Sequence, residues 1–487
     1  MSAAETETRF APALLEQPRG RLARLIRPGA FVWSATALFS LLFVAAAIVE
    51  LRAFQGQRLD LGDMVQAVWS TAHGHFLRVT TPSGDAFVRL GVHADPFLAL
   101  LAPLWWIWPS PLMLLVVQIA AVASGALPVY WLARKRLDSA SAAAGFAAVY
   151  LLYPATQYNA LSYSGPHAVS FAVPLILFAV WFLDNDRLVP FAVTALLAAA
   201  TKEEIGLAVG CLGIWYAVVH GRKLAGATIF ALGLTATLVD FFLVIPHFAP
   251  PGVAPFQQRY AGVGGTPGGI AHTLLTHPGT IAATVTSSSK LGFLALLLVP
   301  LLGLWLLEPL LLLGALPDLG IDLLSSKPQQ TMIEYHYTAG IVPFVVAAAV
   351  LGAGRVRTVH RTRLAAYAVA VTAFLAVGHT PLRQALHELP AARSSNPLHE
   401  AKAHALSLVP AGVPISATNE FGGYLSDRSL LYTFPHIGRA RWAIVDSGDP
   451  AYTSYDYRAI ARMRGEHGWR VVYASQGVEV LRKPRNP

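Results

Sequence analysis

The chain has 487 residues, of which 55% are hydrophobic and 13% are charged. Soluble globular domains carry about 25% charged residues, so this composition excludes an ordinary soluble protein. The net charge of +9 does not indicate nucleic-acid binding, because the basic residues lie in short clusters between apolar runs, as they do in membrane proteins. The single cysteine, Cys211, excludes an internal disulfide and a cysteine metal site.

The apolar runs predict a polytopic membrane protein. Residues 1–29 are polar and arginine-rich, and we expect them to form a cytoplasmic tail without a cleavable signal peptide. Eleven apolar runs follow, and we expect each to cross the bilayer, which takes about 20 residues. They lie near residues 30–51, 111–133, 140–155, 168–183, 188–201, 205–219, 224–246, 291–307, 309–323, 338–353 and 364–379.

Clusters of Lys and Arg support this topology. They precede the first run and follow the second, fourth, sixth and tenth runs. If all eleven runs cross and the N-terminus is cytoplasmic, every cluster is cytoplasmic, as the positive-inside rule requires. The C-terminus is then extracytoplasmic, and we expect the protein in the inner (plasma) membrane of a bacterium.

Residues 52–110 form a long first outer loop in this topology. Within it, the run PFLALLAPLWWIWP, residues 96–109, is too short to cross and is bounded by prolines. Its tryptophans suit the headgroup region of a bilayer. We therefore expect an interfacial or re-entrant helix there.

Two further outer segments differ in composition. Residues 247–290 are rich in Gly and Pro, which predicts a loop. The transmembrane domain, residues 30–380, ends before a region of mixed composition. In that region, residues 381–487, the segments VPISAT, RWAIVDSG and WRVVYAS predict short strands. We expect a small α/β outer domain there.

Ionisable residues gather in the segments that are predicted to lie on the outer face. Each has a simpler explanation by itself, as a solvated cap, an interfacial anchor or part of an aromatic belt. Ionisable side chains at membrane depth are costly, however, and tend to mark functional sites. Their convergence predicts an outer cavity lined by Asp60, Asp63, His93, Asp95, His167, Glu203, Glu204 and His336, with Lys202 and Tyr335 as further substrate-binding residues.

The residue types in this set suggest several kinds of chemistry. Carboxylates beside histidines can act as general bases. They could instead hold a divalent cation, for which Asp60, Asp63, His93 and Asp95 are the candidates. Lys202 could bind a phosphate. The sequence has no Walker loop, no Gly-x-Gly-x-x-Gly fingerprint and no HExxH helix, so ATP-driven transport, nicotinamide chemistry and a zincin protease are unsupported.

Five motifs carry a family resemblance. LDLGDMVQAVW, HADPFLALLAPLWWIWPSPLMLLVVQ, SYSGPHAVSFAVPL, KEEIGL and YHYTAGIVPF occur in this order. Together they resemble an uncharacterised family of prokaryotic predicted membrane proteins, domain of unknown function 2079. The resemblance extends from about Asp60 to the C-terminal segments SATNEFGGYLSDRS and IVDSGD.

That family in turn resembles the C-type glycosyltransferases (GT-C fold). The resemblance implies an all-α GT-C-like membrane domain and a polyprenyl-phosphate-linked sugar donor. It also implies a catalytic acidic residue in the first outer loop, for which Asp60 is the first candidate and Asp63 the second. Many such enzymes carry adjacent acidic residues or an Asp-x-Asp-like pair, whereas this chain has Asp-Leu-Gly-Asp. This departure leaves the role of each Asp, and any metal dependence, open.

The leading hypothesis is a membrane glycosyltransferase that transfers a hexose or pentose at the outer leaflet to a cell-envelope glycan or lipid. Its partners would be membrane lipids, the donor and the acceptor, and not nucleic acid. The alternatives are a transporter or lipid flippase with an acidic and histidine relay, and a scaffold or sensor that binds through its outer domain. Transporters often show inverted repeats, and this sequence has none, which favours the enzyme.

Overall fold

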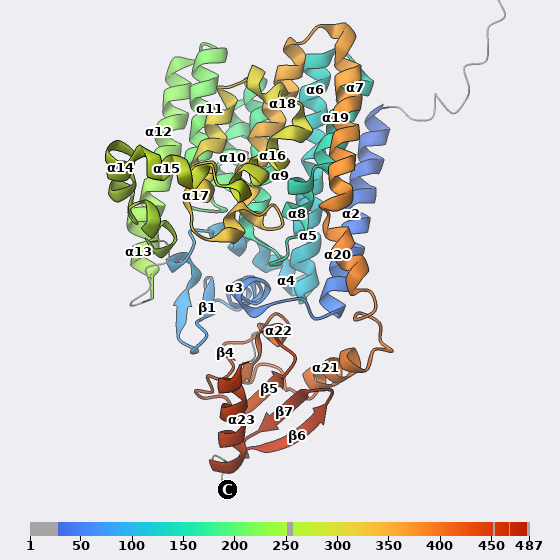
Figure 1. Ribbon diagram of the computed structural model, residues 1–487, viewed down its shortest axis with the longest axis vertical. Coiled ribbons are helices and arrows are strands. Elements are labelled where there is room, and N and C mark those ends of the chain that lie inside the picture. The colour runs from blue at the N-terminus through green and yellow to red at the C-terminus, as the bar shows by residue number, and fades with distance from the viewer. Residues whose placement is uncertain (1–27, 251–256, 451–452, 467, 485–487) are drawn as a thin grey trace, which may run out of the picture.

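A computed structural model describes residues 28–250, 257–450, 453–466 and 468–484. The predicted cytoplasmic tail lies almost wholly outside these residues. The described chain forms a bundle of helices with a small sheet domain at one end (Figure 1). We call the end of the bundle next to the sheet domain the domain end, and the opposite end the distal end.

Ten helices of ten residues or more form most of the bundle. They are α2 (Pro28–Arg52), α5 (Pro111–Ser124), α6 (Ala126–Leu137), α7 (Ala140–Leu152), α9 (Ala172–Asp184), α10 (Leu188–Ala199), α11 (Ile205–Val219), α12 (Lys223–Val239), α18 (Val342–Arg355) and α19 (Thr358–Gly378). The helix α18 is buried along nearly all of its length and lies at the centre. By contrast, α12 and α19 expose apolar side chains such as Leu224 and Phe374, which suits a surface that faces lipid.

Several of these helices have the length and apolarity of a membrane span. Four candidate spans occur among the described residues: 28–52, 111–137, 223–248 and 358–388. A bent pair, Pro278–Val285 and Ser288–Leu301, makes a fifth if it counts as one span. The predicted mostly helical membrane fold is confirmed, and the number of eleven crossings stays a prediction.

Glycines bring α11 and α12 into close contact. Gly206, Gly210 and Gly213 of α11 face Gly226 and Gly233 of α12, and a Cβ atom on Gly213 would collide with the Gly226 carbonyl. Small residues allow membrane helices to approach closely and to gain van der Waals contact. This packing fixes the start of α11 against the second half of α12, where the polar site described below is built.

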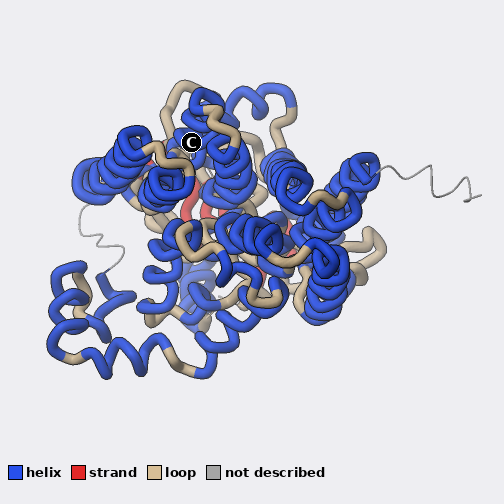
Figure 2. Tube along the Cα trace, turned by 90° about the horizontal axis from the view of Figure 1, so that it is seen from above, coloured by secondary structure: helices blue, strands red, loops and turns tan. Residues whose placement is uncertain are grey.

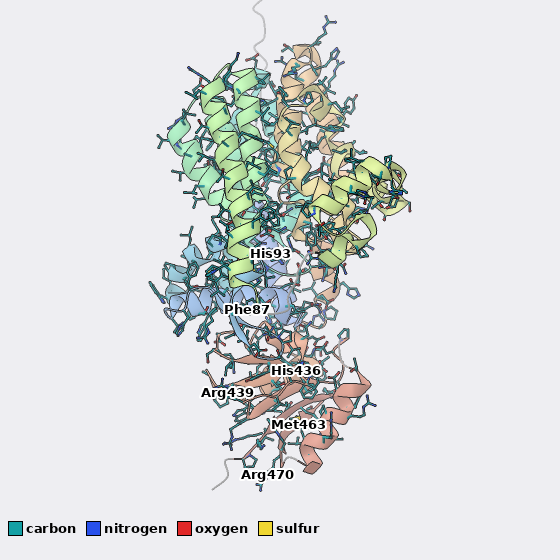
Figure 3. All side chains as sticks on the ribbon, turned by 90° about the vertical axis from the view of Figure 1, so that its left-hand side faces the viewer. Phe87, His93, His436, Arg439, Met463 and Arg470 are labelled. Carbon is teal, nitrogen blue, oxygen red and sulfur yellow. The ribbon has the colours of Figure 1, made fainter. Side chains whose placement is uncertain are left out.

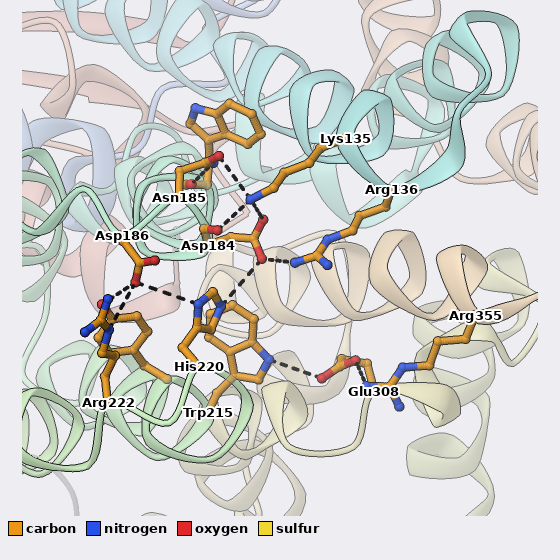
Figure 4. Close-up of polar contacts among 12 residues, drawn as sticks. Lys135, Arg136, Asp184, Asn185, Asp186, Trp215, His220, Arg222, Glu308 and Arg355 are labelled. Carbon is orange, nitrogen blue, oxygen red and sulfur yellow. Dashed lines mark hydrogen bonds and ion pairs between the residues drawn. The ribbon is translucent and has the colours of Figure 1, made fainter.

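A network of charged residues ties the helices together at the distal end. The Asp184 carboxylate is fully buried, and Lys135 Nζ lies 2.7 Å from its Oδ2 atom. Arg136 pairs with the Oδ1 atom of the same carboxylate. Figure 4 shows the basic side chains that gather here, namely Lys135, Arg136, Arg222 and Arg355. Clusters that the positive-inside rule assigned to one membrane face therefore lie at one end of the bundle.

Replacing Asp184 by asparagine is expected to lower the free energy of unfolding by about 1.5–3 kcal/mol, because the charge shared by Lys135 and Arg136 is lost. These cations are 37% and 36% exposed, so water can solvate them and the loss stays below that of a fully buried pair. Thermal unfolding in detergent measures the effect. Asp138→Asn is the control, because Asp138 is 80% exposed and pairs with Arg361 at 3.5 Å. Equal destabilisation by both substitutions would contradict this account.

The first loop folds at the domain end. It contains a π-helical turn, two short helices, a hairpin of two strands and two 3-10 turns. These are η1 (Arg58–Gly62), α3 (Asp63–Ala72), β1 (Arg78–Thr80), β2 (Ala86–Val88), η2 (Arg89–Gly91), η3 (Pro96–Leu101) and α4 (Ala102–Ile107). The predicted interfacial helix corresponds to η3 and α4. Its Trp106 and Trp108 are exposed, whereas Trp105 packs inside the loop.

Helices occupy much of the stretch that the sequence predicted as a loop. The prediction for residues 247–290 is wrong over residues 257–285, which contain η6 (Gln257–Val263), α14 (Pro267–Thr276) and α15 (Pro278–Val285). Pro267 and Pro278 stand at the first helical position, where a missing N–H group costs nothing, and the Thr266 side chain caps the first helix. These helices stand at the side of the bundle (Figure 2, lower left).

Residues 288–338 lead from these helices back to the bundle through short helices and turns. They run through α16 (Ser288–Leu298) and the 3-10 turns η7 (Val299–Leu301), η8 (Leu304–Leu307) and η9 (Leu311–Ala315) to α17 (Leu316–Leu324). The predicted span 309–323 is therefore a 3-10 turn followed by a short helix. The turns η10 (Pro328–Thr331) and η11 (His336–Thr338) lead into α18.

The sheet domain follows α20 (Pro381–Glu388), which packs against α2. Its five strands have the order β4-β3-β5-β7-β6, in which β4, β3 and β5 are parallel. They are β3 (Ile415–Ala417), β4 (Leu431–Thr433), β5 (Trp442–Asp446), β6 (Arg470–Ser475) and β7 (Val478–Arg482), and the helices are α21 (Pro397–Ser407), α22 (Asn419–Gly422) and α23 (Ser454–Glu466). The predicted strand segments are confirmed. The outer location of this domain stays a prediction.

Candidate active site

A cavity of about 970 Å³ lies at the domain end of the bundle. One of its walls comes from the first loop, the turn between α10 and α11, and η11. The other comes from α12, α14 and α17 with their flanking turns. Every residue that the sequence predicted for the site lines this cavity except Tyr335: Asp60, Asp63, His93, Asp95, His167, Lys202, Glu203, Glu204 and His336.

Asp60 faces a pair of histidines. Its Oδ1 atom lies 3.4 Å from His167 Nε2. The Gly165 carbonyl accepts a hydrogen bond from His167 Nδ1 at 3.1 Å, which leaves Nε2 directed at Asp60. His336 stacks on His167 with ring centroids 3.6 Å apart. Burial, together with His167 and Lys202, holds the pKa of His336 well below its usual range, so this ring is neutral.

Asp63 and Asp95 are each paired with an arginine. Asp63 Oδ1 lies 3.5 Å from the Arg58 guanidinium, and burial raises the pKa of Asp63 to about 6 against the opposing effect of that cation. Asp95 accepts a hydrogen bond from Arg89 Nε at 2.8 Å, and both of these side chains are buried. Of these three carboxylates, Asp60 therefore differs in that it faces a histidine and not an arginine.

Glu203 links the first loop to the start of α11. Its Oε1 atom lies 3.0 Å from His93 Nδ1, and its Oε2 atom accepts a hydrogen bond from the Ala94 N–H group at 3.1 Å. Burial disfavours the charged form, but His93 and Lys202 outweigh burial and lower the pKa of Glu203. The ionised Glu203 side chain thus holds the His93 segment in place. Figure 3 shows His93 at the end of the bundle next to the sheet domain.

Cationic side chains gather at another part of the cavity. Lys202 Nζ lies 2.5 Å from Glu204 Oε1 and 5.9 Å from the centre of the Tyr337 ring. Lys327 Nζ lies 5.8 Å from the same ring centre and donates a hydrogen bond to the Tyr337 hydroxyl at 3.2 Å. Although burial opposes it, attraction to Glu204 and Glu203 raises the pKa of Lys202. Two ammonium groups and a phenol therefore converge here, with Arg259 also in the lining.

The rest of the lining is apolar. It comes from the end of α12 and the π-helical turn η5 (Asp240–Val244) that follows it, from α14 and from one face of α17. These residues are Leu238, Phe241, Phe242, Ile270, Leu316, Pro317, Gly320, Ile321 and Leu324. Phe242 and Leu316 are each more than half exposed, and Leu232 and Leu243, which lie on the same helical run but outside the lining, are exposed as well. The apolar wall therefore continues into the surface that would face lipid.

The four residues considered as ligands of a divalent cation each face a separate partner. The pairs are Asp60 with His167, Asp63 with Arg58, His93 with Glu203, and Asp95 with Arg89. Within the described ranges, no three His, Cys, Asp or Glu side chains come together as metal ligands. Because each of these four side chains is already paired with a residue outside the set, we assign no catalytic step to a cation.

Some lining residues could not be selected from the sequence. Lys327 lies shortly before the motif YHYTAGIVPF and Arg259 lies in η6, and the fold places both in the same lining as Lys202. Tyr335 was the predicted aromatic residue, but it lies against Tyr163, with ring centroids 6.3 Å apart, and outside the lining. The next tyrosine in the same motif, Tyr337, takes that place.

The fold of the chain is similar to that of solved structures with the GT-C fold. The crystal structure of ArnT from Cupriavidus metallidurans bound to undecaprenyl phosphate matches with a TM-score of 0.57 at 12% identity, covering 92% of this chain and 98% of that one. The apo structure of ArnT from Cupriavidus metallidurans matches with a TM-score of 0.54 at 12% identity, covering 91% and 97%. The GT-C fold predicted from the sequence is thus confirmed. No curated protein matches the sequence.

The family of the chain is shown by its sequence. Residues 50–480 match the family described as "Predicted membrane protein (DUF2079)". The chain therefore belongs to this family, as its five motifs predicted.

Proposed function

We propose that this protein is a glycosyltransferase that takes a sugar from a polyprenyl-phosphate-linked donor and transfers it to a hydroxyl group of a cell-envelope acceptor. One observation carries the proposal. A single cavity combines a carboxylate beside histidines, a pair of ammonium groups and an apolar wall that continues to the lipid-facing surface. A lipid-linked sugar phosphate has matching parts: a sugar, an anionic phosphate and a hydrocarbon chain.

The reaction follows from this arrangement. The acceptor oxygen attacks the anomeric carbon of the sugar, the bond between that carbon and the phosphate oxygen breaks, and Asp60 accepts the hydroxyl proton as general base. Lys202 and Lys327 stabilise the charge that develops on the leaving lipid phosphate. As an imidazolium, with a proton on each ring nitrogen, His167 orients the Asp60 carboxylate from its Nε2 atom.

The proposed orientation places the cavity at the outer leaflet of the inner membrane. The Lys and Arg clusters gather at the distal end, which would be cytoplasmic under the positive-inside rule. The domain end, with the cavity and the sheet domain, would then lie on the outside. ArnT was crystallised with undecaprenyl phosphate, which supports a lipid of this class as the partner here as well.

Turnover of a defined donor tests the proposal. Purified protein in liposomes would receive undecaprenyl phosphate linked to a radiolabelled hexose or pentose, with short envelope glycans as acceptors. Release of undecaprenyl phosphate with transfer of the label would support the proposal. Movement of the intact donor across the bilayer without release of the sugar would support the transporter alternative instead. If none of the combinations of donor and acceptor is turned over, the result counts against the proposed function.

A tryptophan at Gly320 is expected to block the apolar part of the cavity. Gly320 lines the cavity, and a Cβ atom there meets no atom within 4 Å, so the indole can extend into the space without disturbing the fold. Binding of undecaprenyl phosphate should weaken about tenfold or more, which corresponds to about 1.4 kcal/mol. Gly292→Trp is the control, because Gly292 is an exposed helical glycine outside the lining and is also open at its Cβ position. Unchanged binding in the Gly320 variant would place the lipid elsewhere.

A further inference from the structure

The turn that carries Asp60 is held by residues from the sheet domain. The Arg58 N–H group at the start of η1 donates a hydrogen bond to Asn419 Oδ1 at 3.2 Å. Gln66, one helical turn beyond η1, donates from Nε2 to the Arg428 carbonyl at 3.0 Å. Residues more than 350 positions apart in the sequence are thereby joined at the wall of the cavity.

The Arg58 side chain extends this connection. It is 1% exposed, and its guanidinium donates hydrogen bonds to the Thr80 carbonyl at 2.6 Å and to the Leu431 carbonyl at 3.2 Å. The same guanidinium forms the ion pair with Asp63. A buried charge without partners is very costly, so these carbonyls restrict where Arg58 can lie. Arg58 therefore joins the first loop, the sheet domain and an acidic residue of the cavity.

Glycines make the contact between η1 and α22 close. A Cβ atom on Gly422 would collide with the Arg58 side chain, and one on Gly62 would collide with Ser426 Oγ. Ser426 Oγ in turn donates a hydrogen bond to the Gly422 carbonyl at 2.6 Å. The turn that carries Asp60 thus has little freedom to shift toward the sheet domain.

Charged residues of the sheet domain hold α22 itself. Lys402 Nζ pairs with Glu420 and lies 2.8 Å from Asp446 Oδ2 at the end of β5. The Glu420 N–H group donates to Asp449 Oδ2 at 3.1 Å. Since Lys402, Asp446 and Asp449 are buried, this network fixes α22 to the sheet. A continuous set of contacts leads from the sheet through α22 to Arg58, which stands two residues before Asp60 in η1.

We infer that Arg58 is a positioning residue for Asp60, and that the sheet domain, residues 397–484, sets the orientation of Asp60 through Asn419 and Arg58. The sheet domain is then an integral part of the catalytic machinery and not a separate appendage. This inference rests on the proposed function for its catalytic consequence, but its structural part can be measured independently.

Asn419→Ala removes the side-chain acceptor for the Arg58 N–H group and leaves every lining residue of the cavity intact. Hydrogen–deuterium exchange of residues 57–66 is expected to accelerate about fivefold, as the loss of one hydrogen bond implies. With undecaprenyl-phosphate-linked sugar as the donor, kcat should fall about tenfold or more while KM stays constant, because a small displacement of a catalytic group slows the chemical step. Asn419→Asp retains an acceptor oxygen and should restore both values.

Asn396→Ala is the matched control. Asn396, the residue before α21 and the sheet domain, is also half-buried and accepts hydrogen bonds from two N–H groups, which belong to Leu398 and His399 and not to η1. This variant should leave exchange in residues 57–66 and kcat unchanged. Unchanged exchange in Asn419→Ala, or equal acceleration in both variants, would overturn the inference. If the wild-type protein turns over no lipid-linked sugar, the proposed function fails, and the exchange data still decide whether the sheet domain holds the Asp60 turn.

Discussion

Purified protein with Asp60→Asn is expected to transfer sugar about 10²–10⁴ times more slowly than the wild type, because an amide cannot accept the hydroxyl proton. Binding of undecaprenyl phosphate should be nearly unchanged, since the amide has the size of the carboxylate and the cations Lys202 and Lys327 are intact. Single-turnover transfer and a lipid-binding titration measure the two quantities separately. A fall in transfer without a fall in binding is the result that a catalytic base requires.

Asp85→Asn is the control from the same loop. Asp85 is exposed and accepts a hydrogen bond from Ser83 Oγ at 2.7 Å, outside the cavity lining. This variant should transfer sugar at the wild-type rate, and a loss equal to that of Asp60→Asn would point to a general effect on loop folding. If Asp60→Asn and Asp63→Asn both retain full transfer, the assignment of the base to this loop is wrong.

Lys202→Met is expected to affect stability and lipid binding together. It leaves the Glu204 carboxylate, which is 4% exposed, without the ammonium group now 2.5 Å away. Removing one partner of a buried ion pair typically costs about 3–5 kcal/mol, so the unfolding temperature should fall clearly. Binding of undecaprenyl phosphate should also weaken about tenfold or more, because a charged hydrogen-bond donor is lost.

A double variant separates these two effects. Lys202→Met combined with Glu204→Gln replaces the buried ion pair by two neutral side chains, which is often nearly neutral for stability. The unfolding temperature should therefore recover, whereas binding of undecaprenyl phosphate should stay weak. Recovery of both properties in the double variant would make Lys202 a structural residue and move the phosphate site to other cations, such as Lys327.

The residues around the cavity could largely be predicted from the sequence, because the predicted topology assigned the segments that carry these ionisable residues to one membrane face. Asp60, His167 and His336 are far apart along the chain, yet they form one contact series. The identity of the aromatic residue in the lining depends on the tertiary structure. Whether Tyr335 or Tyr337 faces the cavity depends on the backbone of η11, and composition alone does not determine it.

The fold could be predicted less completely. Long apolar helices such as α2 and α12 follow directly from hydropathy. Residues 257–285 were predicted as a loop because Gly and Pro are usual in turns, but here Pro267 and Pro278 begin short helices. The contacts that lead from Lys402 to Arg58 could not be predicted. These polar residues form no sequence motif, and only the tertiary structure shows that the sheet domain packs beside the first loop.

The apolar wall formed by α12, α14 and α17 has a consequence for how the reaction rate depends on concentration. If the donor reaches the cavity from within the bilayer, the relevant quantity is its two-dimensional density among the surrounding lipids, not its amount per volume of buffer. Adding inert phospholipid or detergent would then slow the reaction at constant bulk donor, as in surface dilution. The apparent KM would be a mole fraction, and a cell could regulate flux through this protein by the size of its polyprenyl-phosphate pool.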